Sequence, residues 1–435
     1  MHPGRAAVHA LVASLVFLVV YGGTSYLTSL RSDVGTWYYA WERHIPFVPW
    51  MIVPYMSIDV FFVLAPFLCR GRAELRTLTR RLVATVVLGG IVFLIYPLQL
   101  AVERPTATGW AGVIYNSFTA IDRPYNLLPS LHIALRTVLA AHYHRHTPRR
   151  WRWALHLWFF LIGLSTLLVW QHHVIDVVGG FILGFVVLWA IDVRPLRLPH
   201  IGNARVAGLY AAGAGLCVLA IAVWPVLGWV MLWPSAALAM VALGYVVLGP
   251  GVYRKQDGRL AFAARVVLAP VLLGQAWSRR HYAKACDPWN AVAPGVWIGR
   301  VLDSEEAERA VASGVTAVLD LSVAFDEAEP FLDGRVAYLH LPVLDLTAPT
   351  PAQREAAIAF IEEHAGAGVV YVHCKIGYSR SVAVVGAWLL ATGRDGTVDA
   401  AIETIRRVRP AVVVRLEVRA FLHEAATATL SEATP

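Results

Sequence analysis

The residues best suited to chemistry lie in the last third of this sequence, where a cysteine precedes an arginine by six positions. An apolar run, VVYVHC, ends at Cys374, a five-residue loop follows, and Arg380 begins a segment typical of a helix. Such a loop turns its backbone N–H groups toward one point beside a helix N-terminus, which suits an anion. The same positive field lowers the pKa of a thiol, and an arginine fork binds two phosphate oxygens. The pattern predicts a cysteine nucleophile acting on phosphate esters.

Three further groups complete this predicted site. Gly377 allows the loop a turn that a side chain would obstruct. Ser381 is expected to hydrogen-bond the sulfur and help expel it, and Asp345, on a loop after a strand, is the predicted proton donor to the leaving alcohol. The alternative is a buried structural cysteine with an arginine nearby. The expected phosphate-binding loop consists of Lys375, Ile376, Gly377, Tyr378, Ser379 and Arg380.

This arrangement resembles the dual-specificity phosphatases of the cysteine-dependent phosphatase superfamily over about residues 289–425. The stretches that carry the resemblance are LDLTAPT, VYVHCK, SRS and AAIETIRRVRP. They are most similar to the lipid-directed branch that dephosphorylates phosphatidylglycerophosphate. The resemblance implies Cys374 as nucleophile, Arg380 as phosphate clamp and Asp345 as general acid. Lys375 adds charge at the rim of the pocket, which suits a polyanionic headgroup.

A second group of candidate residues lies in the apolar half of the chain. PSLH places His132 at the start of one apolar segment, and QHHVID places His172 and Asp176 four residues apart, on one face of a helix. A histidine nucleophile held by a carboxylate, with a second histidine as acid, would form a phosphohistidine. Arg104, in ERPT, is a candidate phosphate ligand. The alternative is that these are polar residues at helix ends, at the membrane interface.

These pieces resemble the type-2 phosphatidic acid phosphatase superfamily over residues 96–180. The resemblance implies His172 as nucleophile, His132 as acid and Asp176 as the orienting group. The forms P-S-L-H and H-H-x-x-D-x-x-G-G are most similar to the inositolphosphorylceramide synthase branch, which transfers a phospho-headgroup. The sequence departs from the superfamily pattern at Pro97, Leu131 and Thr166, which stand in place of a lysine, a glycine and an arginine.

The composition indicates how the second group is positioned. Hydrophobic residues make up 57% of the 435 residues and charged residues only 15%, far below the charge of an average soluble protein, so membrane spans are expected. Eight apolar runs are candidates for an all-α membrane domain. They cover about residues 7–30, 50–69, 82–102, 128–143, 153–171, 174–193, 206–224 and 227–250.

Arginines cluster in alternate loops between these runs, and the positive-inside rule places those loops and the N-terminus in the cytoplasm. Residues 259–280 are predicted to form an amphipathic helix on the inner leaflet. The alternative is a ninth span, kinked at Pro270, which would export everything after it. With the first interpretation, the C-terminal domain is cytoplasmic.

From about residue 289 short strand patterns alternate with amphipathic helices, which predicts an α/β sheet covered by helices. The expected domains are a membrane domain at 1–252, a linker with an interfacial helix at 253–288 and a phosphatase domain at 289–430. The combination resembles a family of bacterial inner-membrane fusion phosphatases, which implies that location. The four cysteines are scattered and form no C-x-x-C pair, so neither a disulfide framework nor a zinc site is implied. No cofactor or metal is expected.

The predicted function is hydrolysis of a phosphate monoester at the membrane, on a phospholipid headgroup. The membrane half would then hold a second, histidine-based phosphatase or phosphotransferase site. The alternative is a protein tyrosine, serine or threonine phosphatase anchored by a lipid-binding membrane domain without catalysis. The expected partners are therefore the lipid bilayer and a phosphorylated lipid or phosphoprotein. Nucleic acid is excluded as a partner, because no basic patch with interleaved aromatic residues occurs.

Overall fold

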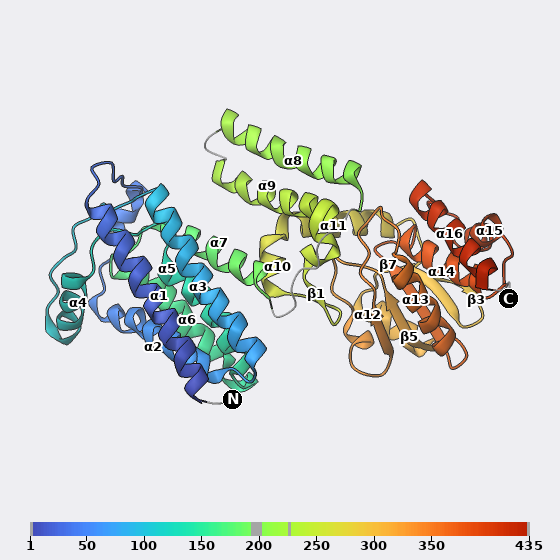
Figure 1. Ribbon diagram of the computed structural model, residues 1–435, viewed down its shortest axis with the longest axis horizontal. Helices are drawn as coiled ribbons and strands as arrows, with labels where there is room; N and C mark the ends of the chain where they lie inside the picture. The colour runs from blue at the N-terminus through green and yellow to red at the C-terminus, as the bar shows by residue number, and fades with distance from the viewer. Residues whose placement is uncertain (1–2, 193–201, 225–227, 433–435) are drawn as a thin grey trace. The chain divides into compact units, whose positions relative to one another are not determined.

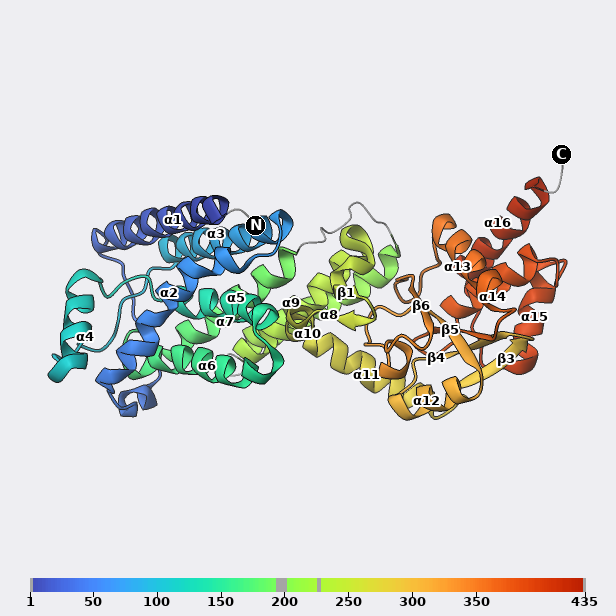
Figure 2. The ribbon, with the colours of Figure 1, turned by 90° about the horizontal axis from the view of Figure 1, so that it is seen from below.

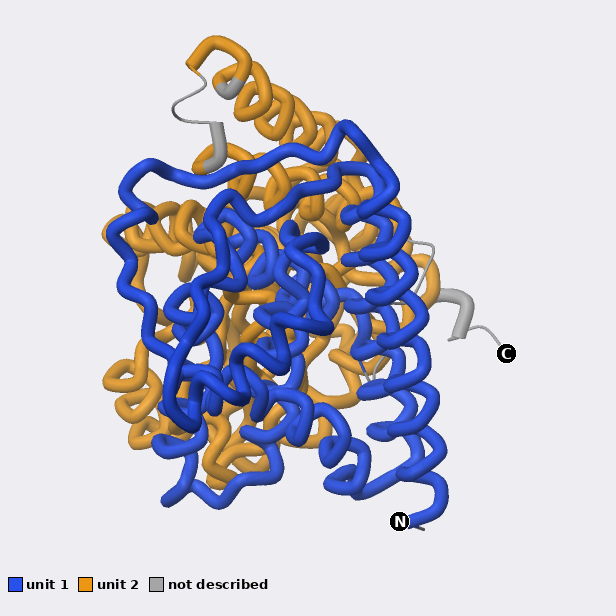
Figure 3. Tube along the Cα trace, turned by 90° about the vertical axis from the view of Figure 1, so that its left-hand side faces the viewer, with its two compact units in different colours: residues 1–195 blue, residues 196–435 orange. Residues whose placement is uncertain are grey.

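The computed structural model describes residues 3–192, 202–224 and 228–432 (Figure 1). The chain divides into two compact units, residues 1–195 and residues 196–435 (Figure 3). The first unit is helical. Its helices are α1 (Pro3–Ser29), α2 (Ile52–Leu68), α3 (Arg72–Ile95), α4 (Gly109–Ile121), α5 (Leu131–His146), α6 (Arg152–Leu168) and α7 (Val174–Ala190).

Helix α5 lies among four other helices of the first unit, because α2, α3, α6 and α7 all pack against it. Two glycines of α7 allow its close contact with α5. A Cβ at Gly180 would lie 2.5 Å from the Ser130 carbonyl oxygen, and one at Gly184 would lie 2.8 Å from Thr137 Cβ. The outer helices instead expose apolar side chains, as α1 does at Leu11 and Leu18. Such surfaces are compatible with a lipid environment.

Five helices among the described residues are long and apolar enough to cross a membrane. They are Pro3–Ser29, Pro49–Leu68, Arg72–Ile95, Arg149–Leu168 and Val230–Tyr253. A largely helical N-terminal region with several apolar helices is thus confirmed, whereas the number of eight spans stays a prediction. Helix α3 begins ten residues before the predicted run, and α4 forms within a segment expected to be a loop. Helix α4 has 13 residues, fewer than the roughly 20 that a membrane-spanning helix needs, so it was not identified as a candidate span.

The second unit begins with a helical hairpin, α8 (Ala204–Val223) and α9 (Gly228–Leu243). A π-helical turn, Gly244–Leu248, and a 3₁₀ turn, Gly249–Tyr253, extend α9. The chain then forms β1 (Lys255–Gln256), β2 (Arg259–Leu260), α10 (Phe262–Val267) and α11 (Ala269–Ala283). Residues 259–280 are therefore divided among three elements rather than forming one helix, because Pro270 cannot continue the first helix and starts the next.

The rest of the unit is a five-stranded sheet with helices on both faces, as the strand and helix patterns predicted (Figure 2). The strand order is β3-β4-β7-β5-β6, with β3 antiparallel to β4 and the other pairs parallel. The strands are β3 (Trp289–Ala293), β4 (Val296–Arg300), β5 (Val315–Asp320), β6 (Ala337–His340) and β7 (Val369–Cys374). Strand β7 is central and almost wholly buried, which is typical of an inner strand of a parallel sheet.

The helices of the sheet are α12 (Ser304–Ala312), α13 (Pro351–His364), α14 (Arg380–Ala391), α15 (Val398–Val408) and α16 (Leu416–Glu432). Helix α12 covers one face and belongs to the same hydrophobic cluster as Tyr371 of β7. Helices α13–α16 lie on the other face, in one cluster with Val370 and Val372, and α16 packs against α14. Helix α14 is almost wholly buried. The strand–loop–helix unit β7–α14 thus forms the centre of the domain, and it carries the predicted nucleophile and clamp.

Candidate active site

The loop between β7 and α14 carries the residues predicted to bind phosphate. Cys374 is the last residue of the central strand and Arg380 the first of the buried helix, so the loop lies at the carboxyl edge of the parallel strands, where ligands bind in open α/β sheets. Gly377 has a φ of +79°, and a Cβ there would lie 2.5 Å from the Gly299 carbonyl oxygen. Glycine is therefore required for this turn.

The thiol of Cys374 lies inside the loop and is only 3% exposed. The Gly377 N–H donates to its sulfur at 3.3 Å, and Ser381 Oγ lies 3.5 Å from the sulfur. Burial alone would raise the pKa of this thiol, but the Arg380 charge and the hydrogen bonds from Ser381 and Gly377 lower the pKa to about 7. The pKa is therefore low enough for the thiolate to form near neutral pH.

Arg380 and Asp345 meet beside this thiol. One guanidinium nitrogen of Arg380 donates to the Val343 carbonyl at 2.8 Å, and Arg380 Nη2 lies 3.2 Å from Asp345 Oδ1. Asp345 is on the loop after β6, and its side chain is about one-third exposed (35%), which leaves it accessible to a substrate. Lys375 Nζ lies 3.9 Å from the other carboxylate oxygen of Asp345. The structure therefore brings these three predicted residues together.

A second arginine, which was not predicted from the sequence as a site residue, forms hydrogen bonds with the backbone of the loop. Arg409 is 2% exposed and donates to the carbonyls of Gly377 at 3.1 Å and Ile376 at 2.7 Å. It also donates to Asn290 Oδ1 on β3 at 2.6 Å. Because these loop carbonyls are directed toward Arg409, the N–H of Gly377 is free to point at the sulfur. Arg409 is the last arginine of the RRVRP stretch, which could have indicated a basic residue near the site. Its contacts with the loop are evident only in the fold.

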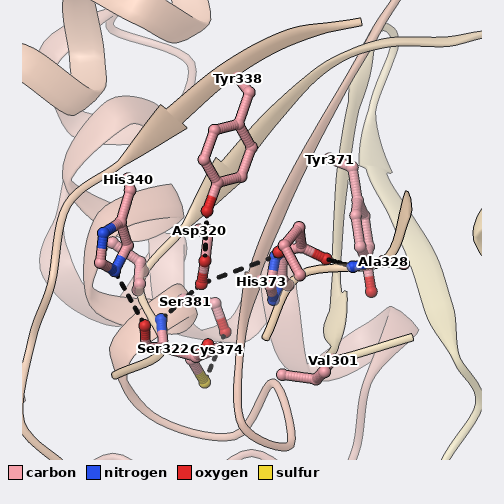
Figure 4. A network of polar contacts seen from close by, with 12 residues as sticks. Val301, Asp320, Ser322, Ala328, Tyr338, His340, Tyr371, His373, Cys374 and Ser381 are labelled. Atoms are coloured by element: carbon pink, nitrogen blue, oxygen red, sulfur yellow. Dashed lines mark hydrogen bonds and ion pairs between the residues drawn. The ribbon is translucent and has the colours of Figure 1, made fainter. Parts of the chain in front are cut away.

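His373, the residue before the nucleophile, belongs to a network of buried charged and polar side chains (Figure 4). His373 Nε2 lies 2.8 Å from Glu327 Oε2 and 3.8 Å from Asp320 Oδ1. Tyr338 donates to Asp320 at 2.7 Å, and the Lys255 ammonium pairs with the same carboxylate. Burial would lower the pKa of His373, but the two carboxylates raise it. Lys255 and His373 thus lie beside the carboxylates of Asp320 and Glu327, next to the nucleophile.

Lys255 of this network comes from β1, in the segment that the sequence predicted to be a linker. Its side chain is 2% exposed, and it also donates to the Ser322 carbonyl at 3.2 Å. Burial would raise the pKa of Asp320, but the charge of Lys255 lowers it below its usual range. The residues around the nucleophile therefore extend outside the predicted boundary at residue 289.

The first unit contains a cavity of about 170 Å³ that both predicted histidines line. His172 Nδ1 lies 3.5 Å from Asp176 Oδ2, and His132 stacks on Tyr55 with its Nε2 2.8 Å from the Tyr55 carbonyl oxygen. Apolar and aromatic residues form most of the wall. It includes Phe17, Tyr21, Tyr55, Met56, Ile58, Phe62, Phe118, Leu131 and Leu135, with Asp59, Asp122 and Asn126 as further polar residues.

Arg104, the predicted phosphate ligand of this second group, pairs with a residue of the cavity wall. Its Nη2 lies 2.8 Å from Asp122 Oδ2, and its Nη1 donates to the Asp122 carbonyl at 2.6 Å. The Asp122 carboxylate therefore balances the charge of the guanidinium. The structure brings His132 and His172 to one cavity and places Asp176 beside His172. Arg104 is paired with Asp122 of the cavity wall.

Residues 296–427 match the dual specificity phosphatase catalytic domain. The chain is 35% identical to Dual specificity protein phosphatase 22 of Homo sapiens over 126 residues, 28% of this chain and 64% of that protein. It is 30% identical to Phosphatidylglycerophosphate phosphatase PTPMT2 of Arabidopsis thaliana over 141 residues, 31% of this chain and 61% of that protein. The chain thus spans less than two thirds of the length of both relatives.

A third relative is covered more fully. The chain is 34% identical to Dual specificity phosphatase 28 of Mus musculus over 131 residues, 28% of this chain and 74% of that protein. The matched residues contain the cysteine loop, Arg380, Asp345 and all the parallel strands of the sheet. The C-terminal part of this chain is a phosphatase domain, and the chain belongs to the dual specificity phosphatase family.

Proposed function

We propose that this protein hydrolyses phosphate monoesters through a cysteinyl-phosphate intermediate. The observation that carries the proposal is a buried thiol with a pKa of about 7, which accepts a hydrogen bond from the Gly377 N–H and adjoins the Arg380 guanidinium. The Cys374 thiolate attacks phosphorus, the bond between phosphorus and the ester oxygen breaks, and the Asp345 carboxyl gives its proton to the leaving alcohol.

The second step regenerates the enzyme. Water attacks the phosphorus of the cysteinyl phosphate, Asp345 takes one proton from that water, and the bond between phosphorus and sulfur breaks. Inorganic phosphate leaves, and the sulfur departs as a thiolate. Ser381, whose hydroxyl lies 3.5 Å from the sulfur, stabilises this departing thiolate. Arg380 offers its planar fork to the phosphate in both steps.

The substrate that we propose is a phospholipid headgroup at the inner leaflet. Several apolar helices precede the catalytic domain, and one relative is named as a phosphatidylglycerophosphate phosphatase. A membrane anchor restricts the enzyme to a two-dimensional pool of lipid and raises its effective concentration. This proposal includes eight spans over residues 1–252, a cytoplasmic phosphatase domain at 289–430 and a bacterial inner membrane as the location.

Lipid discs that contain the purified full chain test this substrate. We expect the wild type to release phosphate from phosphatidylglycerophosphate at a higher kcat/KM than from a phosphotyrosine peptide, and Cys374→Ser to lose both activities. The reverse preference would support a phosphoprotein substrate instead, as the name of Dual specificity protein phosphatase 22 suggests. Residual activity of Cys374→Ser above one-hundredth of the wild type, about the smallest effect expected of a nucleophile, would refute the cysteine mechanism.

A second candidate activity is phosphoryl transfer in the membrane half. It is favoured by one observation: His132 and His172 line the same cavity, and Asp176 lies beside the Nδ1 of His172, which leaves Nε2 as the nucleophile. In the Cys374→Ser background, exchange of a labelled phospho-headgroup between lipids should persist and should be lost on adding His172→Ala. Exchange that persists in this double variant, or no exchange at all, would contradict the candidate.

A further inference from the structure

The loop that carries Asp345 is held by the hairpin of helices α8 and α9. The hydroxyl of Tyr245, just beyond α9, donates to the Asp345 carbonyl at 2.9 Å. The side-chain amide of Asn203, at the start of α8, donates to the next carbonyl, that of Leu346, at 3.1 Å. Leu346 has a φ of +59°, a left-handed conformation that a leucine adopts only under constraint. Two hydrogen bonds from the hairpin therefore fix the turn that follows the proposed acid.

Tyr245 is itself firmly placed. It is 2% exposed, and its ring stacks on Tyr210 of α8 with the centroids 5.8 Å apart. Its carbonyl accepts from the Gly202 N–H at 2.9 Å. It lies in the π-helical turn Gly244–Leu248, and turns of this kind are frequent at functional sites. A hydroxyl held in this way can fix the position of the carbonyl that it contacts.

The same hairpin is connected to the cysteine loop through α11. Gln275 donates to the Tyr210 hydroxyl at 3.1 Å, and its carbonyl oxygen accepts from Lys375 Nζ at 2.7 Å. Tyr253 and Gln275 line the same pocket as Asp345, Lys375 and Arg380. One set of contacts therefore joins the hairpin to both sides of the pocket, the acid loop and the cysteine loop.

We propose that Tyr245 and Asn203 are positioning residues for the general acid, so that the apolar hairpin completes the active site of the phosphatase domain. This inference rests on the proposed function of Cys374 and Asp345. An acid must lie within hydrogen-bond reach of the leaving oxygen, and a displacement of about 1 Å can cost about a hundredfold in rate. Esters with poor leaving groups, such as the alkyl phosphate of a lipid headgroup, depend on this acid most.

The experiment compares two aryl esters on the full chain in lipid discs. p-Nitrophenyl phosphate has a good leaving group that needs little protonation, whereas phenyl phosphate has a poorer one. In Tyr245→Phe and Asn203→Ala we expect kcat/KM for phenyl phosphate to fall about tenfold or more, a part of the roughly 10²- to 10⁴-fold that a general acid contributes. For the nitrophenyl ester kcat/KM should change less than about twofold, because it does not include hydrolysis of the cysteinyl phosphate, in which Asp345 also acts. The double variant, with both Tyr245→Phe and Asp345→Asn, should hydrolyse the nitrophenyl ester as fast as the single variant Asp345→Asn does.

Ser235→Ala is the matched control. Its hydroxyl donates to the Ala214 carbonyl at 3.0 Å and so joins α8 to α9 away from the acid loop, and it should leave both esters unchanged. The rate of alkylation of Cys374 should equal that of the wild type in every variant, which verifies an intact cysteine loop. An unchanged ratio of the two kcat/KM values in Tyr245→Phe and Asn203→Ala would overturn the inference. Full activity of Cys374→Ser would instead overturn the proposed function.

Discussion

Asp345 Oδ1 lies 3.2 Å from Arg380 Nη2, so the proposed acid and the phosphate clamp share one side of the pocket. A phosphate bound by this guanidinium would bring its ester oxygen close to the carboxyl group. The arrangement also places a negative charge beside an anion site. The carboxyl group therefore has two opposed effects: in its protonated form it supplies a proton to the leaving group, and in its ionised form it repels a bound phosphate.

Replacing Asp345 by asparagine separates these two effects. Asp345→Asn should lower kcat for alkyl phosphates by about a hundredfold or more, because no proton donor remains. The same change should tighten inhibition by vanadate by about threefold or more, because one nearby negative charge is gone. Steady-state kinetics with vanadate as the inhibitor measure both. Weaker binding of vanadate in the variant would show that Asp345 does not repel the anion.

The pKa of Cys374 determines how the enzyme reacts with alkylating agents. Because the thiolate is the reactive form and its pKa is about 7, the rate of alkylation by iodoacetamide should rise with pH and reach half its maximum near pH 7. Arg380→Met removes the charge that favours the thiolate, so this midpoint should move upward, toward the value of about 8.5 for a free cysteine. Arg335→Met, at an exposed pair with Glu308, is the control. An unchanged midpoint in Arg380→Met would exclude Arg380 as the cause.

Ser381 is expected to act on the second chemical step. Its hydroxyl stabilises the thiolate that leaves when the cysteinyl phosphate is hydrolysed. In Ser381→Ala we therefore predict a rapid burst of alcohol followed by turnover slowed by about tenfold or more, since the lost hydrogen bond acts on a charged group. Rapid quenching with a labelled substrate should detect the accumulated phosphoenzyme. Equal slowing of the burst and of the turnover would contradict this role.

Lys255 should contribute to the stability of the phosphatase domain. Lys255→Met leaves the buried carboxylate of Asp320 without its ammonium partner, so we expect a loss of about 3 kcal/mol in the free energy of unfolding. Lys255→Met combined with Asp320→Asn should be more stable than the sum of the single changes predicts. Chemical denaturation of the full chain in detergent measures all three variants. Simple additivity would show that the two residues do not interact energetically.

The local parts of the site could be predicted from the sequence. The cysteine, the glycine and the arginine of the loop lie within seven residues, between a strand and a helix whose periodicities are clear. The contacts that complete the site could not be predicted in this way. Lys255 is 65 residues from Asp320, and Tyr245 is 100 residues from Asp345. No local pattern marks such pairs, because only the packed fold brings them together.

In the apolar N-terminal half, apolar runs predicted where helices occur better than where they end. Helix α3 starts at Arg72, in a basic stretch that a hydrophobicity pattern assigns to a loop. Backbone hydrogen bonding continues a helix beyond its apolar part when the flanking residues permit it. The pairing of Arg104 with Asp122 was also not predicted, since both residues lie in polar segments without periodicity.

The placement of Lys255 on β1 has a practical consequence for shortened chains. A fragment that begins at Val296, where the family match starts, would lack this lysine and the edge strand β3. Asp320 would then lack its ammonium partner, and Asn290 could no longer accept from Arg409. A soluble form intended for enzymology should therefore start upstream of β1, even though this retains residues next to the last apolar helix.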